Sequence, residues 1–193
     1  MKSKTYQVSV FLMDIEPKIS RVLLVPENTT LARLHDIIQT AFGWENYHLR
    51  EFVIGDSRYG PDPEMMKISD DDEYYDEKDF SLKEFVDNGV ASILYIYDMG
   101  DYWQHQIQIK SYQEEYPENM PSPVCCLSGQ RAAPPEDIGG VPGYYDFCSG
   151  IQDPSHPQHE DYLSWYSEVS GSDELYNPDF FDLEAVNRLL SKL

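Results

Sequence analysis

NTTLARLHDIIQTAFG, residues 28–43, has the clearest helix pattern of the chain, and the other predicted elements are arranged around it. Its apolar residues recur at spacings of three and four, which places them on one helical face: Leu31, Leu34, Ile37, Ile38, Ala41 and Phe42. Residues 28–30 supply an N-cap, and Gly43 stands where a left-handed residue ends many helices. We therefore predict an amphipathic helix over residues 31–42.

Strand patterns lie on both sides of this helix. Residues 6–13 (YQVSVFLM) and 19–25 are rich in β-branched and aromatic residues, which predicts a hairpin. Residues 48–54 alternate like a half-buried strand, and the apolar run at 92–97 (SILYIY) predicts a strand in the middle of a sheet. Residues 102–112 alternate again, with Trp103, His105, Ile107 and Ile109 on one side.

The rest of the chain divides into loops and short helices. Residues 61–79 are acidic and predict a solvated loop, while prolines and glycines make regular structure improbable from 117 to 142. Short helices are expected over 82–88, 143–151, 156–166 and 183–193. We predict one α+β domain over residues 1–193, with a sheet-and-helix core (1–112), a Pro/Gly-rich loop (113–145) and C-terminal helices (146–193). An N-terminal β-hairpin, a helix and further antiparallel or mixed strands follow one another in a β-grasp-like order.

Composition limits the partners of the protein. Lys and Arg number 14 against 35 Asp and Glu, so the formal net charge is -21 and a polyanion is repelled. We expect a basic protein partner rather than nucleic acid. The sequence has no apolar run of the ~18 residues that a membrane helix requires, and no signal-peptide pattern. With only three cysteines, a cytoplasmic protein with free thiols and no membrane association is expected.

One group of polar residues has the composition of a metal site. The strands at 92–97 and 102–112 predict a second hairpin, with Asp98 and Asp101 at its mouth and His105 four residues along the returning strand. Asp137 and His48 are additional candidate ligands. Carboxylate oxygens and imidazole nitrogens suit a divalent metal. The alternative is structural: the two aspartates hold the turn and His105 packs with Trp103.

The same hairpin and the loop over residues 134–144 predict a binding cleft. Its candidate binding residues, each at the hairpin or in the loop, are Tyr97, Trp103, Glu136, Gly139, Gly140 and Tyr144. The alternative is that prolines and glycines merely fix the loop while Asp137 caps a helix or turn. Both interpretations stand at this point.

Several sequence motifs together resemble those of the plasmid pRiA4b ORF-3-like family, and they occur in the family's order over nearly the whole chain. They are LARLHDIIQTAFGW at 31–44, HL at 48–49 with Phe52, YG at 59–60, YDMGDYWQH at 97–105 and PPEDIGGVPGY at 134–144. Ser20 replaces a common Trp, and Ile138 replaces a frequent Cys, so a cysteine partnership at that position cannot operate. The resemblance implies an α+β protein of a family without an established function, some of whose members travel on mobile elements and bear the label of transposon resolvase.

The resolvase label can be examined on the residues. Ser9 follows a strand-like opening, but Gln7 stands where an Arg is expected, and the C-terminal tail holds only Arg188 and Lys192 as bases. We therefore predict an accessory ligand-binding or protein-interaction domain associated with mobile elements, with no catalytic residue assigned. The alternative is a metal-dependent hydrolase or nuclease-like enzyme that uses a cluster of acids and one histidine: Asp98, Asp101, His105, Glu136 and Asp137.

Overall fold

The computed structural model describes residues 4–67, 73–113, 122–172 and 174–193. Within them, eight strands form one mixed sheet in the order β5-β4-β3-β6-β7-β1-β2-β8. The strands are β1 (Thr5–Leu12), β2 (Ser20–Pro26), β3 (Arg50–Ile54), β4 (Ser57–Gly60), β5 (Tyr74–Asp76), β6 (Ser92–Tyr97), β7 (Trp103–Ser111) and β8 (Cys125–Gln130). The helices are α1 (Leu31–Phe42), α2 (Pro63–Met66), α3 (Leu82–Asp87), α4 (Gly140–Gln152), α5 (His159–Ser170) and α6 (Leu183–Leu190).

The predicted hairpin and helix are confirmed. β1 and β2 pair in antiparallel register, with Val8 opposite Leu23, and β6 lies in the interior of the sheet as expected. The Thr30 side chain accepts a hydrogen bond from the Arg33 amide at the start of α1. Gly43 ends the helix with φ 80°, a conformation that costs glycine little.

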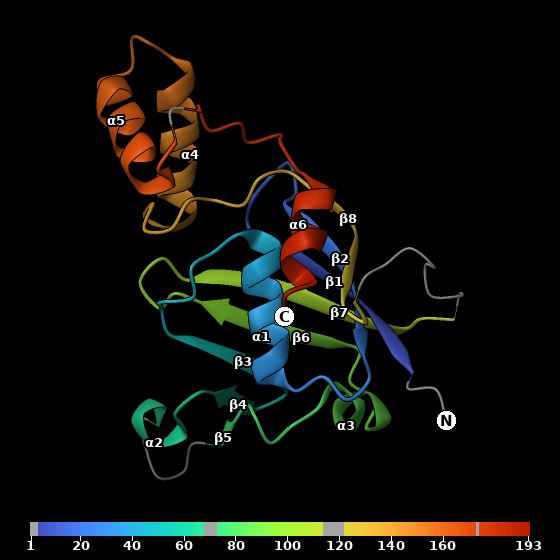
Figure 1. Ribbon diagram of the computed structural model, residues 1–193. Coiled ribbons are helices and arrows are strands. Elements are labelled where there is room, and N and C mark those ends of the chain that lie inside the picture. Colours follow the sequence, from blue (N-terminus) through green and yellow to red (C-terminus); the bar gives the residue numbers. More distant parts are fainter. Residues whose placement is uncertain (1–3, 68–72, 114–121, 173) are drawn as a thin grey trace.

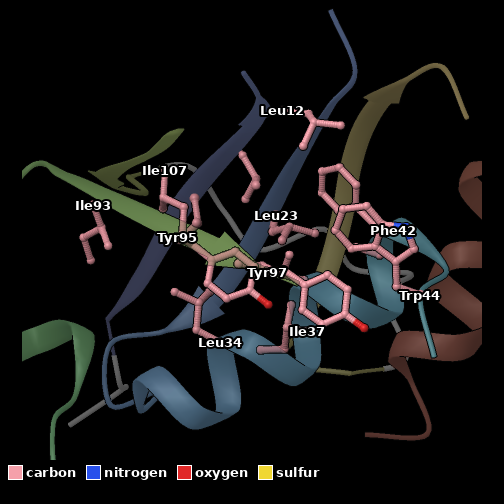
Figure 2. Packing of buried hydrophobic residues seen from close by; sticks show 14 of the residues in the cluster. Leu12, Leu23, Leu34, Ile37, Phe42, Trp44, Ile93, Tyr95, Tyr97 and Ile107 are labelled. Atoms are coloured by element: carbon pink, nitrogen blue, oxygen red, sulfur yellow. The ribbon is translucent and has the colours of Figure 1, made fainter. Parts of the chain in front are cut away.

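The core lies between α1 and one face of the sheet (Figure 1). Alternation along the strands directs one set of their apolar residues to this face, where Leu34 and Ile37 of α1 meet Leu23, Tyr95 and other strand residues (Figure 2). All four of these side chains have no exposed surface. At one end of this layer, the Trp44 ring stacks on the rings of Phe42 and Tyr97 (Figure 2), so the aromatic core extends as far as the loops described below.

Two predicted loops contain regular structure, so those predictions are wrong in part. Residues 61–79 include α2 and β5, and β5 pairs in parallel with β4; residues 68–72 lie outside the described residues. β8 interrupts the predicted loop over 117–142, of which residues 117–121 also lie outside the described residues. β8 falls between Pro123 and Pro134, so no proline removes a hydrogen-bond donor from the strand.

Three connections meet at one end of the sheet, next to the α4–α5 pair. They are the loop after α1, the turn between β6 and β7, and the segment that leads into α4 (Figure 1). Asp182 caps α6 by accepting a hydrogen bond from the Ala185 amide, as predicted. Among the described residues, no helix has the length and apolarity required to span a bilayer.

Candidate functional site

The loop after α1 brings His48 to the end of the sheet. Gly43 and Asn46 both adopt positive φ, which turns the chain sharply after the helix. The Asn46 carboxamide oxygen lies 2.5 Å from Nε2 of buried His35, and the Trp44 indole donates a hydrogen bond to the Pro134 carbonyl at 2.8 Å. These contacts hold the loop at both its α1 side and its α4 side.

The β6–β7 turn contributes Asp98. Asp98 has φ 59°, and its backbone amide donates to the Leu49 carbonyl, which ties the turn to the His48 loop. Its Oδ1 accepts a hydrogen bond from the Gly100 amide at 2.8 Å. The Asp98 carboxylate therefore holds the turn, as the structural alternative predicted, but this hydrogen bond uses only one of its two oxygens.

The segment before α4 contributes Glu136 and Asp137. Glu136 Oε1 accepts hydrogen bonds from the Glu45 amide at 2.8 Å and from the Tyr97 hydroxyl at 3.1 Å. Asp137 has φ 58°, and its Oδ2 accepts a hydrogen bond from the Tyr47 hydroxyl at 2.6 Å. Each carboxylate is thus fixed through one oxygen.

The second oxygens of all three carboxylates converge on one nitrogen. His48 Nε2 lies 3.1 Å from Asp137 Oδ1, 3.5 Å from Asp98 Oδ2 and 3.8 Å from Glu136 Oε2. One ligand atom from each of His48, Asp98 and Asp137 lies within 4.8 Å of the others. We call these four residues, His48, Asp98, Glu136 and Asp137, the His48 cluster.

Two polar atoms of the His48 cluster are buried and unsatisfied. Neither His48 Nε2 nor Glu136 Oε2 has a hydrogen-bond partner of suitable geometry in the described part of the chain. Such atoms are rare in folded proteins, because leaving them unpaired costs free energy. Burial also raises the pKa of Glu136, against the hydrogen bonds from Glu45 and Tyr97 that lower it. A bound cation would satisfy both atoms and favour the ionised carboxylate.

The structure separates His105 from the other predicted metal ligands. Alternation along β7 places it on the core face, where it is fully buried and packs edge-on against the rings of Phe42 and Trp44. Burial lowers its pKa to about 3. Asp101 lies beside the cluster, but its Oδ2 accepts a hydrogen bond from the Gly139 amide at 3.0 Å. Asp101 thus has a structural role, but it joins two loops and does not hold its own turn as the alternative interpretation expected. His105 meets Trp103 through a contact of 3.1 Å between its Nδ1 and the Trp103 carbonyl oxygen.

The predicted binding residues have different positions. Tyr97 and Glu136 contact each other at the cluster. Gly139 is the N-cap of α4 and has φ 91°. A Cβ on Gly140 would lie 2.5 Å from the Asp101 carbonyl oxygen, so a glycine at residue 140 allows the close approach of two loops. Trp103 and Tyr144 are 1% exposed and belong to the core, so they cannot contact a ligand from the surface.

Sequence reasoning missed the loop residues that support the cluster. Tyr47 fixes Asp137, the Glu45 amide fixes Glu136, and Trp44 joins its loop to the segment before α4. Trp44 ends the motif at 31–44, but that motif does not indicate its contact, and positions 45–47 have no periodicity or motif of their own. The one available signal was their place between the predicted helix and His48.

A groove of about 500 Å³ opens beside the cluster. Three acidic residues, Glu45, Glu136 and Asp137, line it together with aromatic residues that include Trp44, Tyr47 and Tyr166. No lysine or arginine is among the described residues that line the groove. A ligand that occupies it therefore meets aromatic surface and acidic residues.

Comparison with known proteins gives consistent results. Residues 4–185 match the family model described as "Plasmid pRiA4b ORF-3-like protein". The chain is 36% identical over 167 residues to "Uncharacterized protein y4hQ" of Sinorhizobium fredii (strain NBRC 101917 / NGR234), covering 86% of this chain and 82% of that one. It is also similar to the crystal structure of the protein of unknown function MM3350 from Methanosarcina mazei Go1. That comparison gives a TM-score of 0.76 at 30% identity and covers 95% of this chain and 98% of the other.

Proposed function

The chain belongs to the plasmid pRiA4b ORF-3-like family, and we propose that it is a ligand-binding accessory domain whose central ligand is a divalent metal ion. The names of its relatives state no function, so the proposal rests on the site. One observation carries it: each of three carboxylates is fixed by hydrogen bonds to one oxygen and directs the other oxygen toward His48 Nε2.

The ligand atoms indicate which metals fit. One imidazole nitrogen and several carboxylate oxygens form a mixed set of borderline and hard donors, which suits Zn²⁺, Mn²⁺ or Fe²⁺. The hydrogen bonds from Tyr47, Tyr97 and the amides of Glu45 and Gly100 orient the carboxylates. Such outer contacts are typical supports of metal ligands.

Titration calorimetry with Zn²⁺ and with Mn²⁺ tests the proposal, using metal-free protein and the variant His48→Gln. We expect one metal ion per chain, and a loss of affinity of more than about tenfold in the variant. His156→Gln is the matched control, because the side chains of His48 and His156 are 21% and 19% exposed and each lies near a carboxylate. Equal binding by both variants, or no binding by the wild type, would contradict the proposal.

Metal-dependent hydrolysis is a second candidate function, favoured by the exposure of one side of the His48 cluster to solvent. The Asp137 side chain is 59% exposed, and the groove beside it gives water and a substrate access to the same carboxylates. A bound metal would lower the pKa of a coordinated water, and Glu136 would accept its proton. Because no lysine or arginine is among the described residues of the groove, an uncharged ester or amide suits it better than a phosphodiester. Metal-dependent hydrolysis of p-nitrophenyl acetate that Glu136→Gln abolishes would support this candidate, and its absence would exclude that reaction.

The cellular setting belongs to the proposal as well. We place the protein in the cytoplasm, a location supported by three cysteines that form no disulfide in the described structure. An acidic protein with a net charge of -21 suits a basic protein partner. Its association with mobile elements rests on the family resemblance and stays a prediction.

A further inference from the structure

Arg21 of β2 is a buried cation beside the aromatic rings of Phe42 and Phe181. Its residue surface is 3% exposed, and its guanidinium carbon lies 4.8 Å from the centre of the Phe42 ring and 4.3 Å from that of Phe181. Burying a charge costs free energy unless an opposite charge or several hydrogen bonds compensate for it.

The hydrogen bonds of Arg21 compensate only in part. Nε donates to the Ala41 carbonyl at 2.8 Å, and Nη1 donates to the carbonyls of Ser20 and Gln130 at 2.7 and 3.0 Å. Arginine has five N–H donors, and the two on Nη2 have no partner among the described residues.

No described carboxylate pairs with Arg21, although acids outnumber bases 35 to 14 in this chain. Burial lowers the pKa of Arg21 to about 10, and the titratable groups that influence it are Cys126 and Tyr176. Burial raises the pKa of both, so both are neutral near pH 7. The guanidinium is therefore a buried cation without a counter-charge in the described structure.

Arg21 lines a groove between the end of α1, helix α6 and the residues that precede α6. Its volume is about 630 Å³, within the usual range of ligand pockets, about 300–1,000 Å³. Leu175, Phe180 and Leu189 line it as well and are 70%, 59% and 45% exposed. The groove thus combines one buried cation with an apolar wall that is open to solvent.

We propose that this groove binds an apolar monocarboxylate, whose carboxylate accepts hydrogen bonds from Nη2 of Arg21 while its hydrocarbon part covers the apolar wall. A carboxylate supplies the missing charge, and hydrogen bonds between two charged groups are the strongest of their kind. Glu174 and Asp182 also line the groove. They disfavour ligands with several negative charges, so a single carboxylate suits the site better than a phosphate.

Decanoate and decan-1-ol are matched probes, because they share an apolar chain and differ in the charged group. Calorimetric titrations in EDTA keep the result independent of the metal proposal. The wild-type protein should bind decanoate about tenfold more tightly than decanol, a difference of about 1.4 kcal/mol. Equal affinities, or no saturable binding of decanoate, would overturn the proposal.

Leu189→Glu tests the place of binding, because it puts a negative charge on the exposed wall and removes no buried group. We expect decanoate affinity to fall about tenfold while decanol affinity changes little. Met65→Glu is the control, since Met65 is 60% exposed and lies on α2, outside the groove. Decanoate binding that both variants weaken equally would show a general charge effect and contradict the assignment.

Arg21→Gln, checked for folding by circular dichroism, should abolish the preference for decanoate over decanol.

Discussion

His48 Nε2 and Asp137 Oδ1 lie 3.1 Å apart, and the other oxygen of Asp137 is held at 2.6 Å by the Tyr47 hydroxyl. A residue of the α1 loop thus orients a carboxylate that belongs to the segment before α4. Residues 47 and 48 are neighbours in the chain, so one short loop supplies both a proposed ligand and the hydrogen-bond donor that orients another. This relationship makes the site sensitive to changes outside the ligands themselves.

Tyr47→Phe should weaken metal binding without unfolding the protein. The variant loses the hydrogen bond to Asp137 Oδ2, and removal of such an outer contact lowers metal affinity about tenfold. Because the Tyr47 residue is 53% exposed, the free energy of unfolding should change by no more than about 0.5 kcal/mol. Calorimetry and urea unfolding measure the two quantities.

The control for this variant is Tyr145→Phe. Tyr145 is 44% exposed, and its hydroxyl accepts a hydrogen bond from the Glu16 amide, away from the His48 cluster. Equal metal affinities of the two variants would show that the hydroxyl of Tyr47 does not orient a ligand.

Asp101→Asn should leave metal affinity within about threefold of the wild type, whereas Asp98→Asn should reduce it more than about tenfold. After the first substitution, the side-chain amide oxygen at position 101 can still accept the hydrogen bond from Gly139 that Asp101 accepts. Asp98, in contrast, directs its free oxygen at His48. Titration of both variants with the same metal distinguishes a residue that joins two loops from a ligand, and the reverse order of effects would refute this assignment.

Gly140→Ala should destabilise the protein by about 1–3 kcal/mol more than Gly171→Ala, as measured by urea unfolding. Both glycines have positive φ, 67° and 61°, so the backbone strain of the two variants is similar. Only at residue 140 would the new Cβ meet the Asp101 carbonyl oxygen, at 2.5 Å, while nothing lies within 4 Å at residue 171. Equal losses in both variants would mean that the two loops do not need this close contact.

Buried His105 should make the protein less stable in acid. Its pKa is about 3 in the folded state, so below about pH 6.5 the unfolded chain binds a proton that the folded protein does not. The free energy of unfolding therefore decreases as the pH falls from about 6 to about 4. In His105→Phe this dependence should be weaker by about 1.4 kcal/mol per pH unit, as measured by urea unfolding across that range. Identical slopes would show that His105 does not titrate on unfolding.

The sequence predicted the elements that periodicity defines. The helix at residues 31–42, the β1–β2 hairpin and the interior position of β6 all follow from apolar spacing and caps. β8 was missed because short edge strands between prolines have weak patterns, and its pairing with β2 depends on a distant part of the chain. Local propensity carries no information about such a partner.

The residues of the candidate site were predictable from the sequence, but the sequence did not show which of the proposed ligands lie elsewhere. His48, Asp98 and Asp137 were proposed as ligands, and the structure brings them together. His105 was proposed because it lies near Asp98 in sequence, yet strand alternation directs it into the core. The supporting role of Tyr47 depends on a contact across 90 residues of chain, which no local pattern indicates.

X-ray absorption spectroscopy of the zinc-loaded protein reports the atoms bound to the metal and therefore shows whether the His48 cluster holds it. We expect one imidazole nitrogen, with oxygen atoms as the other ligands, and loss of the imidazole signal in His48→Gln. Sulfur ligands, or an imidazole signal that persists in His48→Gln, would contradict this expectation and place the metal elsewhere in the protein.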